Sequence, residues 1–567
     1  MDRPVVAHAD ASWATEPPIA VGNAAADVRP RALFDSRVEK AATLLAIAAC
    51  VIYWAGTLML ARRKLMWNDE LYTYYVAMLP SMHDVWNALM ARGEQTPPFF
   101  YVVTRLSLRL FGVNNISIRL PEMLAFWGMG ACLYVSVRRR TTPLSGLCAA
   151  LFPFVTAAYA YALEARSYAL VLGFAAAAYL SWQSLALAKH RVLWSACLTA
   201  SLAAAVSSHY FGAFVVLPFV AGEIVRTAIK RRVDLAVWIA FPLSIVPLMW
   251  QLPLIKANKS YSGAFWSPPQ WVNIPDFYDH LLAPAIVPVA AILVVCGVAA
   301  GLLDRDRAYV RSARIQVPLD ELAVAIGFLA IPIVAVIAAK LVTGAFVNRY
   351  AMPAVIGASI LAGFGSASPF CRTAFMRLLV VVGLCGWLLL DQAREVIQPT
   401  GVTLPVSAEL MARPAKWLDA LPRETRRLPL VIADPHSFVT LSHYGTPEIK
   451  ARVVYLADED RALARLGSNS VERGMVDLVK PWFGMNVMPF EPFVAAHGEF
   501  FVYGDFVRLA FLNWIVPELH AQGMRTELLS RGGDDMLLYV SRDGLRGPSA
   551  EPLDKEAAHT AQAAPTR

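Results

Sequence analysis

The sequence predicts an all-α membrane protein with about eleven transmembrane helices, followed by a C-terminal α/β domain outside the membrane. Its composition is the first reason. Of the 567 residues, 57% are hydrophobic and 17% are charged, whereas soluble chains are roughly 45–50% apolar and about 25% charged. The second reason is the return of charged residues and strand-like segments after residue 400. These observations place a bundle of membrane spans before a water-exposed domain.

Long apolar runs define the predicted spans, since a helix needs ~20 apolar residues to cross a bilayer. Candidate spans lie at 41–61, 118–137, 142–162, 168–188, 192–208, 210–228, 234–252, 281–302, 322–342, 351–367 and 378–393. The segments 1–40 and 544–567 are polar and are predicted to be disordered tails, the first of them cytoplasmic. The membrane domain is therefore expected over 41–395.

Short clusters of Lys and Arg orient these spans. They follow alternate spans, at 138–140, 189–191, 230–232, 305–314 and 372–377. Basic residues are enriched in cytoplasmic loops, so an N-terminus inside the cell puts all these clusters in the cytoplasm. Only the cluster at 62–64 disagrees with this orientation. The loops account for the net charge of +8, and no motif indicates binding of nucleic acid.

This orientation predicts a long first outer loop over 62–117. Its segment 97–112 is apolar but short for a span, and Arg105 and Arg109 lie one helical turn apart within it. We interpret this segment as an interfacial helix on the outer surface. The remaining outer segments are then turns near 163–167 and 209, the loop 253–280, a turn near 343–350, and everything after about 394.

An α/β domain is predicted over 400–543. Strand-like runs occur at 428–434, 451–458, 500–506 and 535–541, and helical patterns at 459–466 and 508–522. Alternation of short strands with helices is typical of an α/β fold. No chemical role for this domain follows from its sequence.

The first outer loop begins with two adjacent carboxylates, Asp69 and Glu70. An interfacial aromatic belt explains the neighbouring Trp67 and Tyr72 but not the acids. A carboxylate near a low dielectric and without a tight ion pair has a raised pKa, which suits a general base. A solvated loop acid is the alternative interpretation.

Further charges fall in the other predicted outer segments. Glu164 and Arg166, followed by Tyr168, lie where the third span returns as the fourth. Charges there are costly unless they are paired or functional, and a helix-end ion pair is the alternative. Lys256 and Lys259, in the loop 253–280, are candidate anion-binding cations or simply solvated residues.

Arg349 and Tyr350 stand at the outer entry of the tenth span. Arg stays charged and binds phosphate through two parallel hydrogen bonds. A side chain that merely anchors the helix at the interface is the alternative. The topology places all of these residues on one membrane face, where an acid can activate a hydroxyl and cations can hold a leaving phosphate.

Four stretches carry a resemblance to a known family: WNDELYTYY (67–75), QTPPFFYVV (95–103) with GVNNISIRLPE (112–122), YALEARSYAL (161–170) and NRYAMPA (348–354). Over residues 41–395 the chain resembles GT-C glycosyltransferases that use polyprenyl-phosphate sugars. Within them it is similar to the bacterial branch related to protein O-mannosyltransferases and the lipid A aminoarabinose transferase.

This resemblance implies inverting sugar transfer at the outer leaflet of the membrane. Asp69 matches the catalytic Asp of the family, and Glu70 matches its acidic neighbour, which orients the acceptor or Asp69. The pair Glu164 and Arg166 matches a second site around the cavity. Arg349 and Tyr350, a further matching pair, are expected near the lipid phosphate. No DxD triplet occurs in the first loop, so neither a metal nor another cofactor is implied.

The leading hypothesis is thus a glycosyltransferase of the bacterial inner membrane. It moves a hexosyl or pentosyl unit from a polyprenyl-phosphate donor to an extracytoplasmic lipid, glycan or protein acceptor. Its other expected partners are membrane lipids, and no nucleic acid is expected to bind. The first alternative is a transporter or flippase of lipid-linked sugars, which predicts charges at mid-membrane depth and broken helices. The second is a binding or assembly protein in which the C-terminal domain carries all the function.

Overall fold

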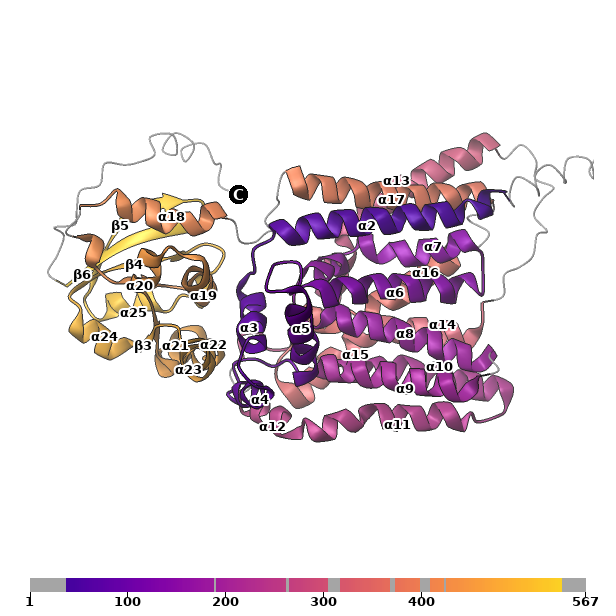
Figure 1. The fold of residues 1–567 in the computed structure, drawn as a ribbon, viewed down its shortest axis with the longest axis horizontal. Coiled ribbons are helices and arrows are strands. Elements are labelled where there is room, and N and C mark those ends of the chain that lie inside the picture. The colour runs from indigo at the N-terminus through magenta and orange to yellow at the C-terminus, as the bar shows by residue number, and fades with distance from the viewer. Residues whose placement is uncertain are drawn as a thin grey trace, which may run out of the picture.

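The computed structural model describes residues 37–187, 190–261, 265–303, 317–367, 373–397, 408–422 and 425–542. A helical bundle and an α/β unit follow one another along the long axis of the molecule (Figure 1). Residues 1–36 of the predicted N-terminal tail, the predicted C-terminal tail, the basic cluster at 305–314 and Arg372 lie outside the described residues. Residues 37–40, predicted to be part of the disordered tail, are helical and lead into the first span.

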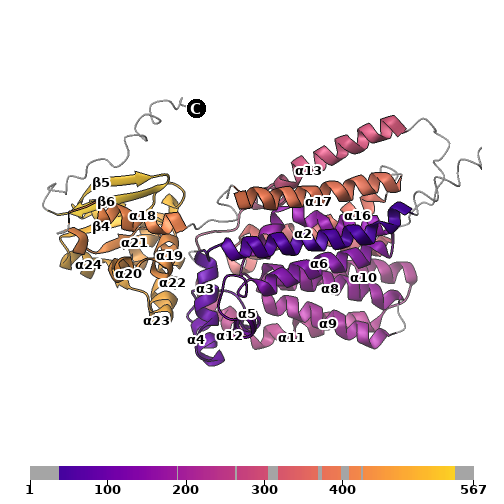
Figure 2. The same cartoon turned by 45° about the horizontal axis from the view of Figure 1, so that its top comes forward.

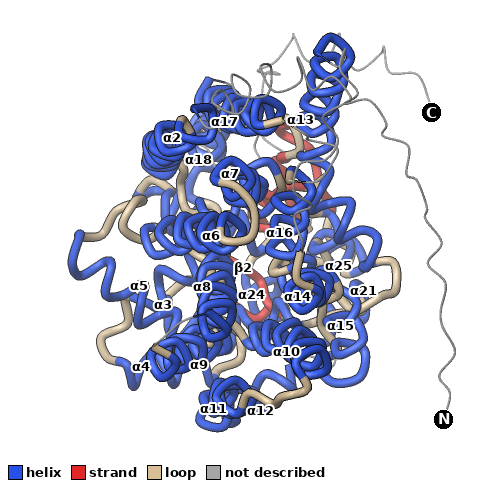
Figure 3. The backbone as a smooth tube through the Cα atoms, turned by 90° about the vertical axis from the view of Figure 1, so that its right-hand side faces the viewer, coloured by secondary structure: helices blue, strands red, loops and turns tan. Residues whose placement is uncertain are grey.

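Seven of the described helices are long and apolar enough to cross a membrane. They are α2 (Ala42–Arg63), α6 (Leu120–Arg138), α8 (Tyr168–Leu187), α9 (Arg191–Ser208), α10 (Val216–Lys230) with the preceding turn η3 (Tyr210–Val215), α13 (Asn273–Leu303) and α17 (Ala374–Ile397). Figure 3 shows the bundle from the end opposite the sheet, with its helices running toward the viewer. The chain is a multi-pass membrane protein, as its composition predicts.

Three further predicted spans are bent pairs of helices. They are α7 (Pro143–Leu151) and η1 (Phe152–Val155) with η2 (Ala157–Leu163), α11 (Leu235–Trp250) with α12 (Leu252–Tyr261), and α14 (Leu319–Leu329) with α15 (Ile331–Ala338) and the π-helical turn η6 (Ala339–Thr343). The bends are 78°, 64° and 45°. Pro153, Pro253 and Pro332 lie close to the respective breaks, and proline removes a backbone donor and disrupts a helix. The shorter apolar helix α16 (Ala354–Ser366) occupies the remaining predicted span.

The first predicted outer loop folds into three helices at the end of the bundle. These are α3 (Asn68–Ala77), α4 (Met82–Met90) and α5 (Pro98–Phe111). Helix α5 coincides with the predicted interfacial helix. It begins directly after Pro97 and ends at Gly112, whose φ of +77° favours glycine. Helices α3 and α5 run across the direction of the spans (Figure 1), so they cap one end of the bundle.

The α/β unit is built on one sheet of six strands in the order β3-β2-β1-β4-β6-β5. Four strands pair in parallel: β1 (Leu430–Ile432), β2 (Val453–Ala457), β3 (Val487–Pro489) and β4 (Glu499–Asp505). Strand β6 (Asp535–Ser541) pairs antiparallel with β4 on one side and with β5 (Arg525–Gly532) on the other. The helices around it are α18 (Ala408–Asp419), α19 (Pro435–Tyr444), α20 (Pro447–Arg452), α21 (Glu459–Leu466), α22 (Ser470–Gly474), α23 (Lys480–Phe483), α24 (Phe490–Ala496) and α25 (Ile515–Ala521).

The four predicted strands are present, but the sequence did not indicate β3 or β5. Strand β3 is a three-residue segment that ends at Pro489, and proline is depleted in strands. Strand β5 lies at the sheet edge and none of its residues is fully buried, so its apolar and polar residues do not alternate. The predicted helix over 508–522 is wrong in its first half, because only α25 (Ile515–Ala521) and a short 3₁₀ turn at Ala510–Leu512 are helical.

The α/β unit packs on the cap helices of the bundle, and both parts share one hydrophobic core. The Tyr444 hydroxyl accepts a hydrogen bond from the Met66 backbone N–H at 2.8 Å. The Tyr75 hydroxyl lies 3.0 Å from Nδ1 of His443. The Tyr75 ring also stacks on Phe483 at 4.8 Å. Figure 2 shows α19 on the side of the sheet that faces α3, so the sheet face that α19 covers is turned toward the cap of the bundle.

A close approach between α16 and α14 gives a test of the bundle packing. A Cβ added at Gly357 would lie 2.3 Å from the Ala325 carbonyl oxygen, whereas one added at Gly386 in α17 meets nothing within 4 Å. Gly357→Ala is therefore expected to lower the free energy of unfolding by ~1–3 kcal/mol. Gly386→Ala is the matched control and should not lower it. Thermal unfolding in detergent measures both, and equal unfolding temperatures would contradict this packing.

Candidate active site

Helix α3 presents the two adjacent carboxylates, Asp69 and Glu70, in its first turn. The Trp67 backbone N–H donates a 3.3 Å hydrogen bond back to Oε2 of Glu70, which closes the start of the helix. Acidic side chains are favoured there because the helix dipole is positive at its N-terminus. Neighbouring positions on a helix point in different directions, and Asp69 and Glu70 accordingly enter different surroundings.

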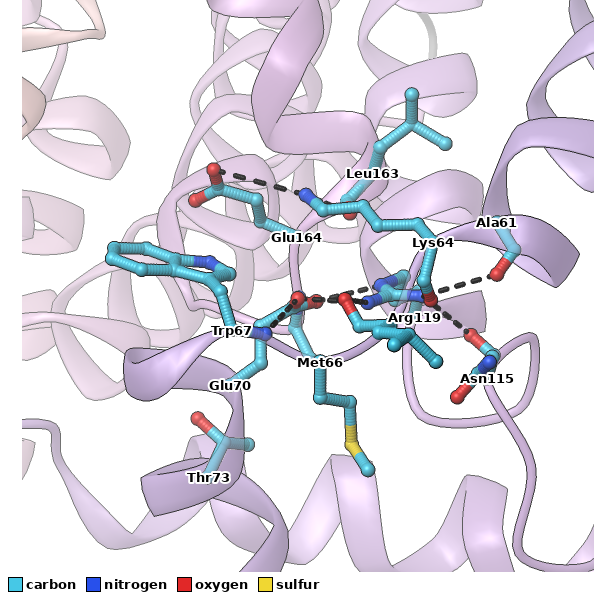
Figure 4. A network of polar contacts seen from close by, with 12 residues as sticks. Ala61, Lys64, Met66, Trp67, Glu70, Thr73, Asn115, Arg119, Leu163 and Glu164 are labelled. Atoms are coloured by element: carbon cyan, nitrogen blue, oxygen red, sulfur yellow. Dashed lines mark hydrogen bonds and ion pairs between the residues drawn. The ribbon is translucent and has the colours of Figure 1, made fainter. Parts of the chain in front are cut away.

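Glu70 is fully buried against Arg119 (Figure 4). Nε and Nη2 of Arg119 donate to its two carboxylate oxygens at 2.6 and 2.7 Å. Nη1 of Arg119 donates to the carbonyl oxygens of Ala61 and Lys64, at the end of α2. Burial alone would raise the pKa of Glu70, but Arg119 and Lys64 hold that pKa below its usual value. This pair fastens α3 to the ends of α2 and α6, and Glu70 does not line a cavity.

Lys64, one of the three residues in the basic cluster that disagreed with the predicted orientation, is buried, whereas Arg62 and Arg63 are exposed. Its side chain is 2% exposed, and Nζ donates to the Leu163 carbonyl oxygen at 2.9 Å. The Glu164 carboxylate lies 4.0 Å away from Nζ, and the two side chains point toward one another (Figure 4). Burial raises the pKa of Glu164, although Lys64 opposes this. Lys64 is thus a buried partner of Glu164, and neither residue lines the two cavities described below.

Asp69 belongs to a chain of alternating charges. Its carboxylate lies 3.1 Å from Nη1 of Arg349 and 4.0 Å from Nε of Arg166. Arg166 in turn donates to Glu94 at 2.9 Å. The Glu94 carboxylate also accepts from the Thr96 hydroxyl at 2.6 Å. Two acids and two cations from four distant segments are therefore joined in one group.

The pairing corrects one expectation from the sequence. Asp69 is not free of ion pairs, and its pKa is not raised. Burial favours a raised pKa, but Arg349 and Arg166 lie so close that the pKa is lowered instead. Asp69 is therefore ionised at neutral pH and is held by Arg349.

A cavity of about 200 Å³ opens around this group of charges. The bundle contributes Asp69, Arg166, Arg349 and Tyr350, and α19 of the α/β unit contributes His436. The cavity is further lined by Trp67, Asn68, Tyr72, Gly93, Glu94, Gln95, Phe265, Trp266, Pro435, Ser470, Val471, Gly474, Phe511 and Leu512. The site is therefore shared between the membrane bundle and the α/β unit.

Aromatic rings pack around the Arg349 guanidinium and its neighbour. The guanidinium carbon lies 5.8 Å from the centre of the Tyr168 ring, within the range of a cation–π contact. The Tyr350 ring stacks on Phe211 at 4.6 Å and lies 5.0 Å from His209. Tyr168 thus supports the site from behind Arg349 without lining the cavity.

The structure places the two predicted lysines elsewhere. Lys256 and Lys259 lie on α12 with exposed side chains and line neither cavity. The expectation that they add cations to the site is not supported by this geometry. Within the described ranges, no three His, Cys, Asp or Glu side chains come together in a way that could hold a metal ion.

Sequence reasoning missed Glu94, Arg119 and His436. Arg119 lies in a stretch that supported the family resemblance, but nothing in the sequence paired it with Glu70. His436 lies far along the chain from Asp69, yet it contributes to the pKa of Asp69. His436 follows Asp434 and Pro435 at the start of a helix, and this local sequence does not indicate a contact with Asp69. Only the packing of the two parts brings these residues together.

Comparisons with known proteins agree with this fold. The family described as dolichyl-phosphate-mannose-protein mannosyltransferase matches residues 95–250. A crystal structure of ArnT from Cupriavidus metallidurans in the apo state aligns with 14% identity and a TM-score of 0.51, covering 88% of this chain and 97% of that one. The same enzyme bound to undecaprenyl phosphate aligns with equal identity and coverage and a TM-score of 0.47. No curated protein sequence matches the chain.

The family match and the shared fold confirm the resemblance to GT-C glycosyltransferases that the sequence indicated. The family match confirms the enzyme class, a glycosyltransferase. The likeness to ArnT confirms the architecture of a membrane bundle with a C-terminal domain. The matched segment includes Arg119, Arg166 and Tyr168 but begins after Asp69.

Proposed function

We propose that the chain transfers a monosaccharide from a polyprenyl-phosphate sugar to an extracytoplasmic lipid, glycan or protein acceptor, with inversion at the anomeric carbon. The observation that carries this proposal is the contact of Asp69 with Arg349 and Arg166 inside one cavity. A carboxylate and two guanidinium groups supply a proton acceptor and a phosphate site side by side. The matching family acts on a polyprenyl-phosphate sugar by its name, which supports the same donor class here.

In the proposed step, an acceptor hydroxyl attacks the anomeric carbon from the side opposite the phosphate. Asp69 takes the proton of that hydroxyl, the new carbon–oxygen bond forms, and the bond to the phosphate oxygen breaks. Polyprenyl phosphate leaves with the electron pair. Arg349 and Arg166 stabilise the negative charge that develops on it. A single displacement of this kind inverts the configuration of the sugar.

The ion pair between Asp69 and Arg349 couples donor binding to catalysis. A phosphate bound by Arg349 competes with Asp69 for the same guanidinium group. As Arg349 turns to the phosphate, Asp69 loses its strongest counter-charge, and its pKa rises from the lowered value. The Asp69 carboxylate therefore becomes a better proton acceptor when the polyprenyl-phosphate sugar is bound.

The arrangement of charges supports an outward-facing cavity. The basic clusters at 138–140 and 230–232 follow the ends of α6 and α10, at the opposite end of the bundle from α3 (Figure 1). Because such clusters mark the cytoplasmic side, we place the cavity and the α/β unit on the extracytoplasmic side of a bacterial inner membrane. An accessibility assay with a membrane-impermeant thiol reagent on an introduced Ser437→Cys would test this side.

One observation favours the flippase alternative, namely the three bent spans. Broken helices are common in transporters. The charge group of Asp69 lies at the end of the bundle, however, whereas transport sites lie near mid-depth. Movement of a lipid-linked sugar across liposomes, without transfer to any acceptor, would favour that alternative.

A direct test of the proposed function is transfer by the purified protein. A panel of polyprenyl-phosphate sugars serves as donor, and a lipid extract of the cell envelope serves as acceptor. Transfer from at least one donor is expected, with inverted configuration in the product. Absence of transfer from every donor, by a protein that is folded and binds polyprenyl phosphate, would contradict the proposal.

Arg349→Ala is expected to weaken the binding of polyprenyl monophosphate. A charge-assisted hydrogen bond contributes about 1.5–3 kcal/mol, so Kd should rise roughly 10- to 100-fold. Titration of the purified protein measures this. The control is Lys340→Ala, which removes a cation that contacts the Trp271 ring and lines neither cavity. An unchanged Kd in Arg349→Ala would make Arg349 a structural anchor.

A further inference from the structure

A second cavity, of about 260 Å³, lies in the α/β unit beside the first one. It opens at the carboxyl ends of β1 and β4. Asp434 follows β1, and Asp505 is the last residue of β4. These ends are tied together, since the Asp505 backbone N–H donates to Oδ2 of Asp434 at 3.2 Å. The start of α19 and residues of α18 and β6 complete the walls.

The position of this cavity in the sheet is informative. Strand β1 is bonded to β2 on one side and to β4 on the other. The chain therefore leaves β1 toward β2 and β3, and later returns to the opposite side of β1 with β4. In open α/β sheets, ligands bind in the crevice outside the carboxyl ends of the strands at such a reversal of strand order. The cavity lies at that point of the sheet.

The second cavity continues into the first. Trp67, Asn68 and His436 line both of them. Asn68 is 8% exposed, and its Oδ1 accepts no hydrogen bond from any described residue. The buried Nε1 of Trp67 likewise has no partner among the described residues. Buried polar atoms normally have partners, and these two unpartnered atoms belong to residues that line both cavities.

The walls of the crevice combine donors, acceptors and an aromatic ring. The Tyr503 hydroxyl donates to Asp535 at 2.9 Å. Nε of Arg508 donates to Asp505 at 3.1 Å, while its two terminal nitrogens make no hydrogen bond to any described residue. The side chain of Arg508 is 61% exposed, and Arg508 is near enough to His436 to influence its pKa. Its guanidinium is therefore available to a ligand at the mouth of the crevice.

This set of groups suits a carbohydrate. Sugar hydroxyls both donate and accept hydrogen bonds, so they match a wall of carboxylates, hydroxyls and a guanidinium. The Trp67 ring offers an apolar face at the junction with the first cavity. The rest of the wall is largely apolar, with Met411, Leu441 and Leu509 among its residues. It therefore offers apolar surface that can pack against the C–H face of a sugar ring.

We propose that the crevice binds the carbohydrate part of the acceptor and directs one of its hydroxyls past Trp67 toward Asp69. This inference rests on the proposed function, because it assigns the acceptor side of that reaction. It gives the α/β unit the task of selecting the acceptor, while the bundle binds the donor. The acceptor is then a glycan or a glycolipid with its sugar end in the crevice.

Kinetics with the acceptor in the envelope lipid extract test the crevice. Arg508→Ala should raise the KM for acceptor about 10-fold or more and leave the KM for donor unchanged. Ser437 of α19 also lines the crevice. Ser437→Trp, which fills the crevice, should raise the acceptor KM further. The matched control is Arg525→Ala, an exposed arginine on β5 that lines neither cavity. Wild-type acceptor KM in both crevice variants would overturn the proposal.

A second measurement does not depend on transfer. A photo-crosslinking amino acid is placed at Ser437 or, as control, at Arg525, in full-length protein exposed to the same extract. Mass spectrometry of the adducts should find carbohydrate-bearing molecules at position 437 only. Peptide adducts alone, or none, would overturn the crevice as a carbohydrate site. Carbohydrate adducts from a protein that transfers no sugar would instead keep the crevice and contradict the proposed function.

Discussion

Asp69→Asn is expected to lower kcat by a factor of about 10² to 10⁴, the usual contribution of a positioned general base. The amide keeps the shape of the carboxylate but cannot take the proton of the acceptor hydroxyl. Because the substitution also removes the partner of Arg349 at 3.1 Å, the guanidinium is left for the donor phosphate alone. Affinity for polyprenyl monophosphate should therefore be unchanged or higher.

The combination of lost turnover and retained donor binding distinguishes catalysis from folding. It is measured by transfer kinetics together with titration of polyprenyl monophosphate. Asp84→Asn is the control, since Asp84 caps the exposed start of α4 in the same loop and lines neither cavity. A near-normal kcat in Asp69→Asn would show that Asp69 is not the general base.

Arg119→Met is expected to lower the free energy of unfolding by about 3–5 kcal/mol, because it leaves the carboxylate of Glu70 buried without its partner. The loss is a large share of the 5–15 kcal/mol that stabilises a typical protein. Both side chains are fully buried, so water cannot replace the missing hydrogen bonds. A low yield of folded protein and a lower unfolding temperature in detergent are the expected signs.

Two further variants separate the ion pair from the simple loss of an arginine. The double variant Glu70→Leu with Arg119→Met removes both charges and should recover part of the lost stability. Arg109→Met changes an exposed arginine of α5 in the same loop and should have little effect. An Arg119→Met protein as stable as the wild type would show that this pair does not hold α3 in place.

The parts of the fold that depend on local composition were predictable. Apolar length located each span, and it did so even where Pro153, Pro253 and Pro332 bend the helix, because bending does not change hydropathy. The two edge strands were missed, since β3 contains Pro489 and β5 has no fully buried residue. Local patterns carry no information about such elements.

The candidate site divides in the same way. Asp69, Arg166 and Arg349 were identified because charges at the end of an apolar span are unusual in themselves. Their mutual distances, and the pairing of Glu70 with Arg119, depend on how segments far apart in sequence pack together. Lys256 and Lys259 had the right charge and were predicted to lie in an outer loop, but on α12 they do not line the cavity. A predicted membrane side reduces the number of candidate site residues but does not show which of them contact one another.

The fastening of α3 by Arg119 has a mechanical consequence. Arg119 joins the first turn of α3 to carbonyl groups at the end of α2 and itself stands at the start of α6. Asp69, one residue before Glu70, therefore moves with these two spans. Transmembrane helices adjust their tilt to the thickness of the bilayer. Lipids of different acyl length should therefore shift the Asp69 carboxylate relative to Arg349, which lies just before α16. The rate of sugar transfer is then expected to depend on membrane thickness as well as on substrate.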